Sequence, residues 1–239
     1  PGLLGKADML GYAVCHQIES HSFILGGRAL PLCARCTGTF IGALVGLFGQ
    51  LVVLRRRRAA GFPPVGILIV LIGFSFLWAA DGLNSYLALI RAPHAYAPSN
   101  QLRLMTGALN GLTMSALILP VVNITLWREF AEEPSIQDLR DLGVLLLLEV
   151  GFVGIVLWGA GWLLYPLAIL SGAAVLVLLG SVNAVLAVIV VGRENTVERW
   201  RGACFALATG AFLALVQVGL IDLVRYRLTG TLGGFPIPQ

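Results

Sequence analysis

Residues 37–58 read TGTFIGALVGLFGQLVVLRRRR, and this stretch decides the fold class. An uncharged apolar run is followed directly by four consecutive arginines, Arg55 to Arg58. A helix of about 20 apolar residues crosses a bilayer core, and arginines collect in the loops that remain on the cytoplasmic side. The stretch therefore predicts a membrane-spanning helix that ends inside the cell.

The composition of the whole chain agrees with this prediction. Hydrophobic residues make up 58% of the 239 residues and charged residues 12%, against roughly 25% charged residues in an ordinary soluble protein. Disordered, collagen-like and disulfide-rich secreted classes are excluded by this composition. The net charge of +4 owes much to the arginine run, which is a topology signal rather than a nucleic-acid site. The expected partner is the lipid bilayer, with no nucleic acid.

Six segments are long and apolar enough to approach the length of a membrane span. Their residues do not alternate as the strands of a membrane barrel do, so we expect an all-α, polytopic helical bundle. The segments are 37–54, 65–81, 104–127, 142–164, 167–191 and 202–224. This division predicts an N-terminal segment at 1–36, a six-helix transmembrane domain at 37–224 and a C-terminal tail at 225–239.

The arginine run predicts the orientation in a prokaryotic cytoplasmic membrane. With Arg55 to Arg58 inside, alternation of six spans returns the chain to its starting side. Both termini, the loop at 82–103 and the turn at 159–166 are then expected on the outer face.

Small residues recur every fourth position in the first and third spans. Such stripes let helix backbones approach closely in lipid, so we expect both stripes to face protein. The two stripes are Gly38, Gly42 and Gly46, and Gly107, Gly111 and Ser115.

Cysteine and histidine are concentrated ahead of the first span. Cys33 and Cys36 form a C-x-x-C pair, whose spacing places both thiols on one face of a helix, while Cys15 and His21 lie upstream of a glycine- and proline-containing turn. Four such ligands suit zinc, and His16 is a competing ligand or a hydrogen-bonding partner of one. A disulfide at the outer face and inert buried thiols are the alternative interpretations.

Polar residues in other spans meet this cluster if the predicted topology holds. Asp81 ends the second span and Arg103 begins the third, and a carboxylate near the hydrocarbon edge needs a partner, so a bracing pair is expected. Glu149 lies within the fourth span, where an acidic residue is a candidate functional group.

These residues resemble an uncharacterised prokaryotic membrane-protein family, domain of unknown function 2085. The resemblance covers roughly residues 9–111 and implies one site on an all-α membrane scaffold, without naming a reaction. The family signature runs Cys-His, Ser-Phe and Pro-x-Cys-x-Arg-Cys-Thr-Gly, followed by an aromatic residue and a glycine, and here it is matched by Cys15, His16, Ser22, Phe23, Pro31, Cys33, Arg35, Cys36, Thr37, Gly38, Phe40 and Gly42. The later family positions, Asp-Gly, Arg and Thr-Gly, are matched by Asp81, Gly82, Arg103, Thr106 and Gly107.

Three functions fit these observations. The first is a membrane protein whose outer-face cluster binds zinc and ties the N-terminal segment to the bundle. The second is a thiol-disulfide oxidoreductase in which Cys33 and Cys36 exchange disulfides and pass electrons to a quinone. The third is an accessory subunit that binds other subunits of a respiratory or photosynthetic membrane complex. Whether the protein is an enzyme does not follow from the sequence.

Overall fold

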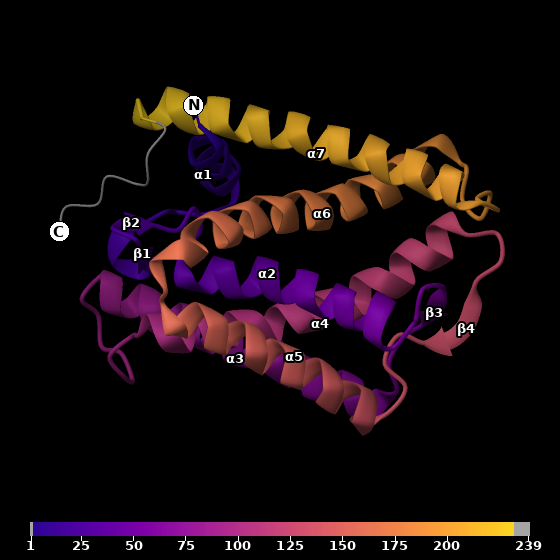
Figure 1. The fold of residues 1–239 in the computed structure, drawn as a ribbon, viewed down its shortest axis with the longest axis horizontal. Coiled ribbons are helices and arrows are strands. Elements are labelled where there is room, and N and C mark those ends of the chain that lie inside the picture. The colour runs from indigo at the N-terminus through magenta and orange to yellow at the C-terminus, as the bar shows by residue number, and fades with distance from the viewer. Residues whose placement is uncertain (1, 232–239) are drawn as a thin grey trace.

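The computed structural model describes residues 2–231 and consists of long helices joined by short connections (Figure 1). Within these residues, six helices are long and apolar enough to cross a membrane, which confirms the predicted all-α membrane bundle. The spanning helices are α2 (Ala34–Phe48, continued by the π-helical turn Gly49–Val53), α3 (Val65–Leu89), α4 (Asn100–Leu126), α5 (Leu139–Trp158), α6 (Leu164–Val191, preceded by the 3₁₀ turn Gly161–Leu163) and α7 (Trp200–Thr229).

The ends of several helices differ from the predicted spans. α3 continues to Leu89 rather than ending at 81, and α4 begins at Asn100 rather than 104. Asp81 is therefore a helix-interior residue whose neighbours along α3 include the polar Asn84 and Ser85, both buried against protein. Hydropathy ended this span too early because it treats such polar residues as exposed. At the other terminus α7 runs to Thr229, beyond the predicted 224, and residues 232–239 of the predicted tail lie outside the described residues.

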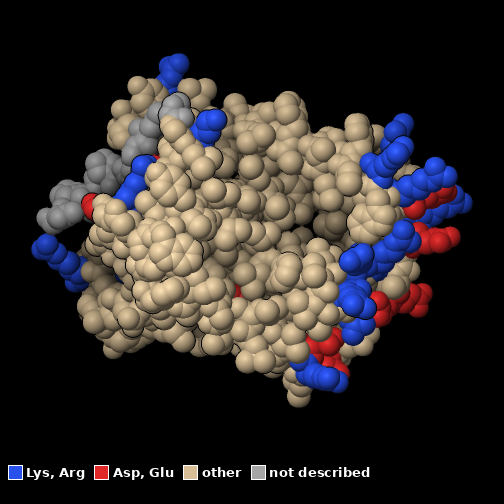
Figure 2. Space-filling view, viewed as in Figure 1, with Lys and Arg blue, Asp and Glu red and all other residues tan. Residues whose placement is uncertain are grey.

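The two ends of the bundle carry different small elements. One end, here named the cysteine end, holds α1 (Leu3–Val14), the 3₁₀ turn Glu19–His21 and the antiparallel hairpin of β1 (Ile24–Leu25) and β2 (Arg28–Ala29). The other, named the arginine end, holds the parallel pair of β3 (Ala59–Gly61) and β4 (Ala131–Pro134) beside Arg55 to Arg58. Charged side chains gather toward both ends and leave an apolar band between them (Figure 2), as a bilayer requires.

α2 and α4 pack side by side along the two predicted stripes. A Cβ atom added at Gly38 would overlap the Leu104 carbonyl oxygen, and one added at Gly46 would overlap the Ser115 side chain. A Cβ at Gly111 would lie 2.5 Å from the Ala43 backbone nitrogen. The contact positions rise together along both helices, so the helices run parallel. The prediction that both stripes face protein is confirmed, and we call this contact the glycine seam.

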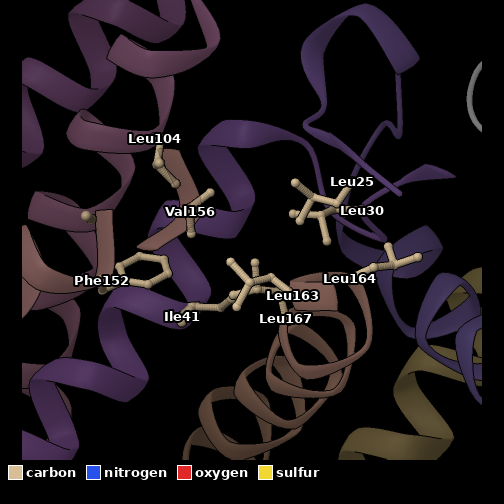
Figure 3. Packing of buried hydrophobic residues seen from close by; sticks show 10 residues of the cluster. Leu25, Leu30, Ile41, Leu104, Phe152, Val156, Leu163, Leu164 and Leu167 are labelled. Atoms are coloured by element: carbon tan, nitrogen blue, oxygen red, sulfur yellow. The ribbon is translucent and has the colours of Figure 1, made fainter. Parts of the chain in front are cut away.

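A hydrophobic cluster joins the hairpin to the bundle (Figure 3). Leu25 and Leu30 come from the hairpin, Ile41 from α2 and Phe152 from α5, and they meet the leucines that begin α6. Buried apolar area of this kind holds the N-terminal segment against the helix ends. The cysteines of that segment are thereby positioned at the start of α2.

Candidate metal centre

The loop between α1 and α2 brings the upstream cysteine back to the start of α2. α1 ends at Val14, and Cys15 follows in extended conformation. The side-chain amide of Gln17 donates hydrogen bonds to the carbonyl oxygens of Asp8 (2.8 Å) and Pro31 (2.9 Å), which closes the loop. Gly26 and Gly27 make the hairpin turn with positive φ angles of 56° and 81°, a conformation that glycine adopts at no steric cost. Cys33 then lies at the N-cap of α2.

Three of the candidate ligands converge. The ligand atoms of Cys15, His16 and Cys33 all lie within 4.8 Å of one another. Cys15 and Cys33 are 5% and 2% exposed. The Cys15 sulfur also accepts hydrogen bonds from the backbone N–H groups of Cys33 (3.2 Å) and Gln17 (3.4 Å). These bonds orient the Cys15 sulfur toward the N-terminus of α2.

The other two predicted ligands lie beside this group. Cys36, in the first turn of α2, packs in the same buried cluster as Cys15 and Cys33. His21 lies against His16, with ring centroids 5.4 Å apart in an edge-to-face arrangement. The set Cys15, His21, Cys33 and Cys36 stays a prediction, and of the two histidines it is His16 whose ligand atom lies together with those of Cys15 and Cys33.

Burial and mutual contact change the acidity of these groups. Hydrogen bonding to the Cys33 and Cys36 thiols lowers the pKa of Cys15, while the same Cys15 contact raises the pKa of Cys33. Burial lowers the pKa of His16, and it lowers the pKa of His21 to about 4. Both imidazoles are therefore neutral at physiological pH, which is the form that ligates a metal.

Hydrogen bonding of His16 constrains how it could bind an ion. The backbone N–H of Ile18 donates to its Nδ1 at 3.1 Å. Ligation through Nδ1 would replace that bond, and ligation through Nε2 would require the ring proton to move to Nδ1. Metal binding at His16 would therefore reorganise the loop at residues 16–18.

Asp81 pairs with a different arginine from the one predicted. Its carboxylate forms an ion pair with Arg35, whose guanidinium also donates to the Asp81 carbonyl oxygen (3.0 Å) and to Ser85 (2.9 Å). The Tyr96 hydroxyl donates to the second carboxylate oxygen at 2.9 Å. Arg35 lies between the two cysteines of C-x-x-C, so this pair anchors the first turn of α2 to α3. The predicted pair with Arg103 is wrong because α4 begins earlier than expected and its arginine faces the loop instead.

Arg103 supports the same end of the bundle through another route. Its guanidinium donates to the Asn100 side chain at 2.7 Å, and Asn100 in turn donates to the carbonyl oxygens of Ser20 (3.1 Å) and Ser22 (3.3 Å). Arg103 thus positions the segment that carries His21. Both arginines therefore brace the cysteine end, Arg35 through α3 and Arg103 through Asn100.

Residues far along the chain also hold this loop, and no sequence motif pointed to them. Arg225, near the end of α7, donates to the Cys15 carbonyl oxygen at 2.9 Å, and its guanidinium lies 3.8 Å from the centre of the Tyr12 ring. The Tyr12 hydroxyl donates to the Thr231 carbonyl oxygen at 2.7 Å. Arg35, by contrast, stands inside the signature motif and could have been considered as the partner of Asp81.

Glu149 does not belong to this site. It lies on α5 against the glycine seam, where a Cβ added at Gly42 would be 3.1 Å from its Oε2. The residue is 2% exposed, and neither carboxyl oxygen has a hydrogen-bond partner among the described residues. Asn183 and Gln217, further polar residues of the predicted spans, instead bond to each other at 2.9 Å between α6 and α7.

Comparison with known proteins bears on the same part of the chain. Residues 15–117 match the family model described as predicted membrane protein (DUF2085). The resemblance predicted from the motifs is confirmed. An uncharacterized protein of Methanocaldococcus jannaschii is 28% identical over 117 residues, which are 49% of this chain and 69% of that protein. No solved structure matches. The DUF2085 match contains Cys15, Cys33 and Cys36, the Arg35–Asp81 pair, all of α2 and α4 as far as residue 117.

Proposed function

We propose that the cysteine end binds one zinc ion through Cys15, Cys33, Cys36 and one of His16 and His21, and that the ion ties the N-terminal segment to the bundle. The observation that carries the proposal is the convergence of the Cys15, His16 and Cys33 ligand atoms within 4.8 Å. Zinc–sulfur bonds of about 2.3 Å in a tetrahedron separate two sulfurs by about 3.8 Å. A modest contraction of these three ligand atoms would therefore bring them to the spacing of zinc ligands, with Cys36 as the fourth ligand of the proposal.

The charges around the cluster suit such an ion. Zinc with three thiolates and one neutral histidine carries a net charge of about −1. Arg35 and Arg103 both lie near enough to the two histidines to influence their pKa values. Their positive charge offsets the negative charge of the loaded site in a region that is partly removed from water.

The buried sulfurs support a structural ion over disulfide exchange. All four cysteines are free thiols in the structure, but Cys15 and Cys33 are almost fully buried. A thiol that attacks another protein's disulfide must be accessible as a thiolate. Four protein ligands, in turn, leave a zinc ion no open position for a substrate.

Metal analysis of the detergent-purified protein tests the proposal. We expect about one zinc per chain in the unmodified protein and a large loss in Cys15→Ser, Cys33→Ser and Cys36→Ser. Cys204→Ser is the matched control, since Cys204 is exposed on α7 and should keep the metal. Comparison of His16→Ala with His21→Ala identifies the fourth ligand. Equal metal content in all cysteine variants would contradict the proposal.

We further propose that the arginine end faces the cytoplasm and the cysteine end faces outward, because the arginine run follows α2 directly. Cysteines introduced one at a time at the exposed Glu194 and Pro93, in a Cys204→Ser background, report the two ends, and the background protein gives the labelling of Cys15, Cys33 and Cys36 to be subtracted. An impermeant maleimide added to intact cells should label Pro93→Cys and leave Glu194→Cys unlabelled. The opposite pattern would invert the orientation.

A further inference from the structure

A crevice of about 500 Å³ lies between α2, α4, α6 and α7, close to the arginine end. Figure 2 shows the surface hollowed toward that end, between the α6–α7 side and the α2–α4 side. Its wall is mostly aliphatic and includes Leu47, Leu51, Leu119, Leu126, Val177 and Leu207. A space of this volume holds little more than one turn of a helix about 10 Å across. It suits a thin hydrocarbon chain better than a protein segment.

Inside the crevice, the polar side chains of Asn123 and Ser181 are already engaged. The Asn123 amide donates to the Ala59 carbonyl oxygen at 2.8 Å, and its oxygen accepts a bond from the Trp127 indole at 3.1 Å. The Ser181 hydroxyl donates to the Val177 carbonyl oxygen at 2.7 Å. Because these groups need no further partner, the interior selects an occupant without polar atoms.

The mouth of the crevice has the opposite character. Arg57 lines it and is exposed, and among the described residues it has no acidic partner. Its neighbour Arg56 is engaged by Glu133 (2.7 Å) and Asp141 (3.1 Å). Arg57 is therefore the arginine of this pair that is available to an anion from outside the chain.

Two tryptophans frame the mouth at the same level. The Trp127 and Trp200 ring centroids lie 4.8 Å apart, and the guanidinium of Arg58 lies 4.5 Å from the centre of the Trp127 ring. Tryptophan and arginine at one depth are typical of the level at which lipid headgroups meet hydrocarbon. The crevice thus runs from headgroup level into the apolar band.

We propose that this crevice binds one anionic phospholipid, with an acyl chain between α4 and α7 and the phosphate at Arg57. The apolar wall accounts for the chain, and the unengaged arginine beside the tryptophans accounts for the charged headgroup. A neutral isoprenoid would pack against the apolar wall but would offer no anionic group to Arg57. A second copy of the protein would cover the mouth without filling the space.

Fluorescence quenching by brominated lipids tests the proposal. Trp78, Trp158 and Trp162 are replaced by Phe, which leaves Trp127 and Trp200 beside the crevice. The protein is reconstituted in phosphatidylcholine vesicles with a minor share of phosphatidylglycerol, and bromine is carried on the acyl chains of one lipid at a time. We expect quenching per brominated molecule to be about fivefold greater for phosphatidylglycerol, as one arginine–headgroup contact implies.

Two variants separate a built site from general attraction to the arginine run. Arg57→Asn should abolish the preference, whereas Arg55→Asn, the same change at an exposed arginine outside the crevice, should keep it. Ala203→Phe, which fills the crevice from α7, should reduce quenching by both lipids. Equal quenching by the two lipids, or equal losses at Arg55 and Arg57, would overturn the proposal.

Discussion

The α2–α4 pair and the α6–α7 pair are both built from long apolar helices, yet they are buried to very different extents. In their most apolar 18-residue windows, 56% and 61% of the residues of α2 and α4 are buried, against 33% and 17% in α6 and α7. α6 is more apolar than α7, yet both helices are less buried than α2 and α4. Apolar sequence does not require burial in protein here, because lipid solvates an apolar helix as well as protein does. Small residues, rather than hydrophobic ones, identify the helices that pack most closely.

The largest effect is expected from bulky residues in the glycine seam. Gly111→Val would place side-chain atoms on the backbone of α2, where a Cβ alone would lie 2.5 Å from the Ala43 nitrogen. We expect a loss of about 3 kcal/mol or more in unfolding free energy, at the upper end of overpacking costs. Gly73→Val on α3 is the control, since no atom lies within 4 Å of its added Cβ. Thermal melting in detergent should give a lower melting temperature for Gly111→Val than for Gly73→Val. Equal melting temperatures would show that the glycine seam is not the main contact between the helices.

The next largest effect concerns the Arg35–Asp81 pair within the same region. Asp81→Ala leaves a guanidinium that is only 17% exposed without its carboxylate. We expect a cost of up to about 3 kcal/mol, below the 3 to 5 kcal/mol of fully buried pairs. A double-mutant cycle with Arg35→Ala should show coupling, measured as melting temperature and metal content.

The matched cycle replaces Arg103 in place of Arg35. Arg103 bonds to Asn100 rather than to Asp81, so Asp81→Ala and Arg103→Ala should couple less strongly than Asp81→Ala and Arg35→Ala. Stronger coupling of Asp81 to Arg103 than to Arg35 would contradict the Arg35–Asp81 ion pair.

A smaller effect of opposite sign is expected at Glu149. Its buried carboxyl has no hydrogen-bond partner among the described residues, so it gains nothing that offsets its desolvation. Glu149→Leu should therefore leave the protein equally stable or more stable by about 1 kcal/mol, and Glu149→Gln should be nearly neutral. Chemical denaturation in mixed micelles measures both. A loss as large as that of Asp81→Ala would reveal a partner for this carboxyl.

The smallest effect is expected on the lipid-facing side of α7. No atom lies within 4 Å of a Cβ added at Gly219, so Gly219→Ala should change stability by less than about 0.5 kcal/mol. Gly210→Ala on the same helix should cost more, because its Cβ would lie 2.6 Å from the Ala184 backbone nitrogen. If the two substitutions had equal effects, the α6–α7 contact would not depend on close backbone approach.

Much of the fold followed from local patterns. Runs of apolar residues predicted each spanning helix, and the spacing of Gly38, Gly42 and Gly46 predicted which face of α2 meets protein. The end of α3 could not be predicted this way, since Asp81 and Asn84 are buried against partners that a hydropathy profile does not contain. For the same reason, the sequence pattern predicted Arg103 as the partner of Asp81, because the contact of Arg35 with α3 is visible only in the tertiary structure.

The sequence by itself determined that this chain is a helical membrane protein with one Cys/His cluster, because bilayer thickness and metal chemistry act on residue type and local spacing. Only the tertiary structure decided which residues surround that cluster. The choice of Arg35 as partner, the approach of His16 and the contact from Arg225 on α7 depend on helix ends and rotations. These are set by how the helices pack together, which no single segment encodes.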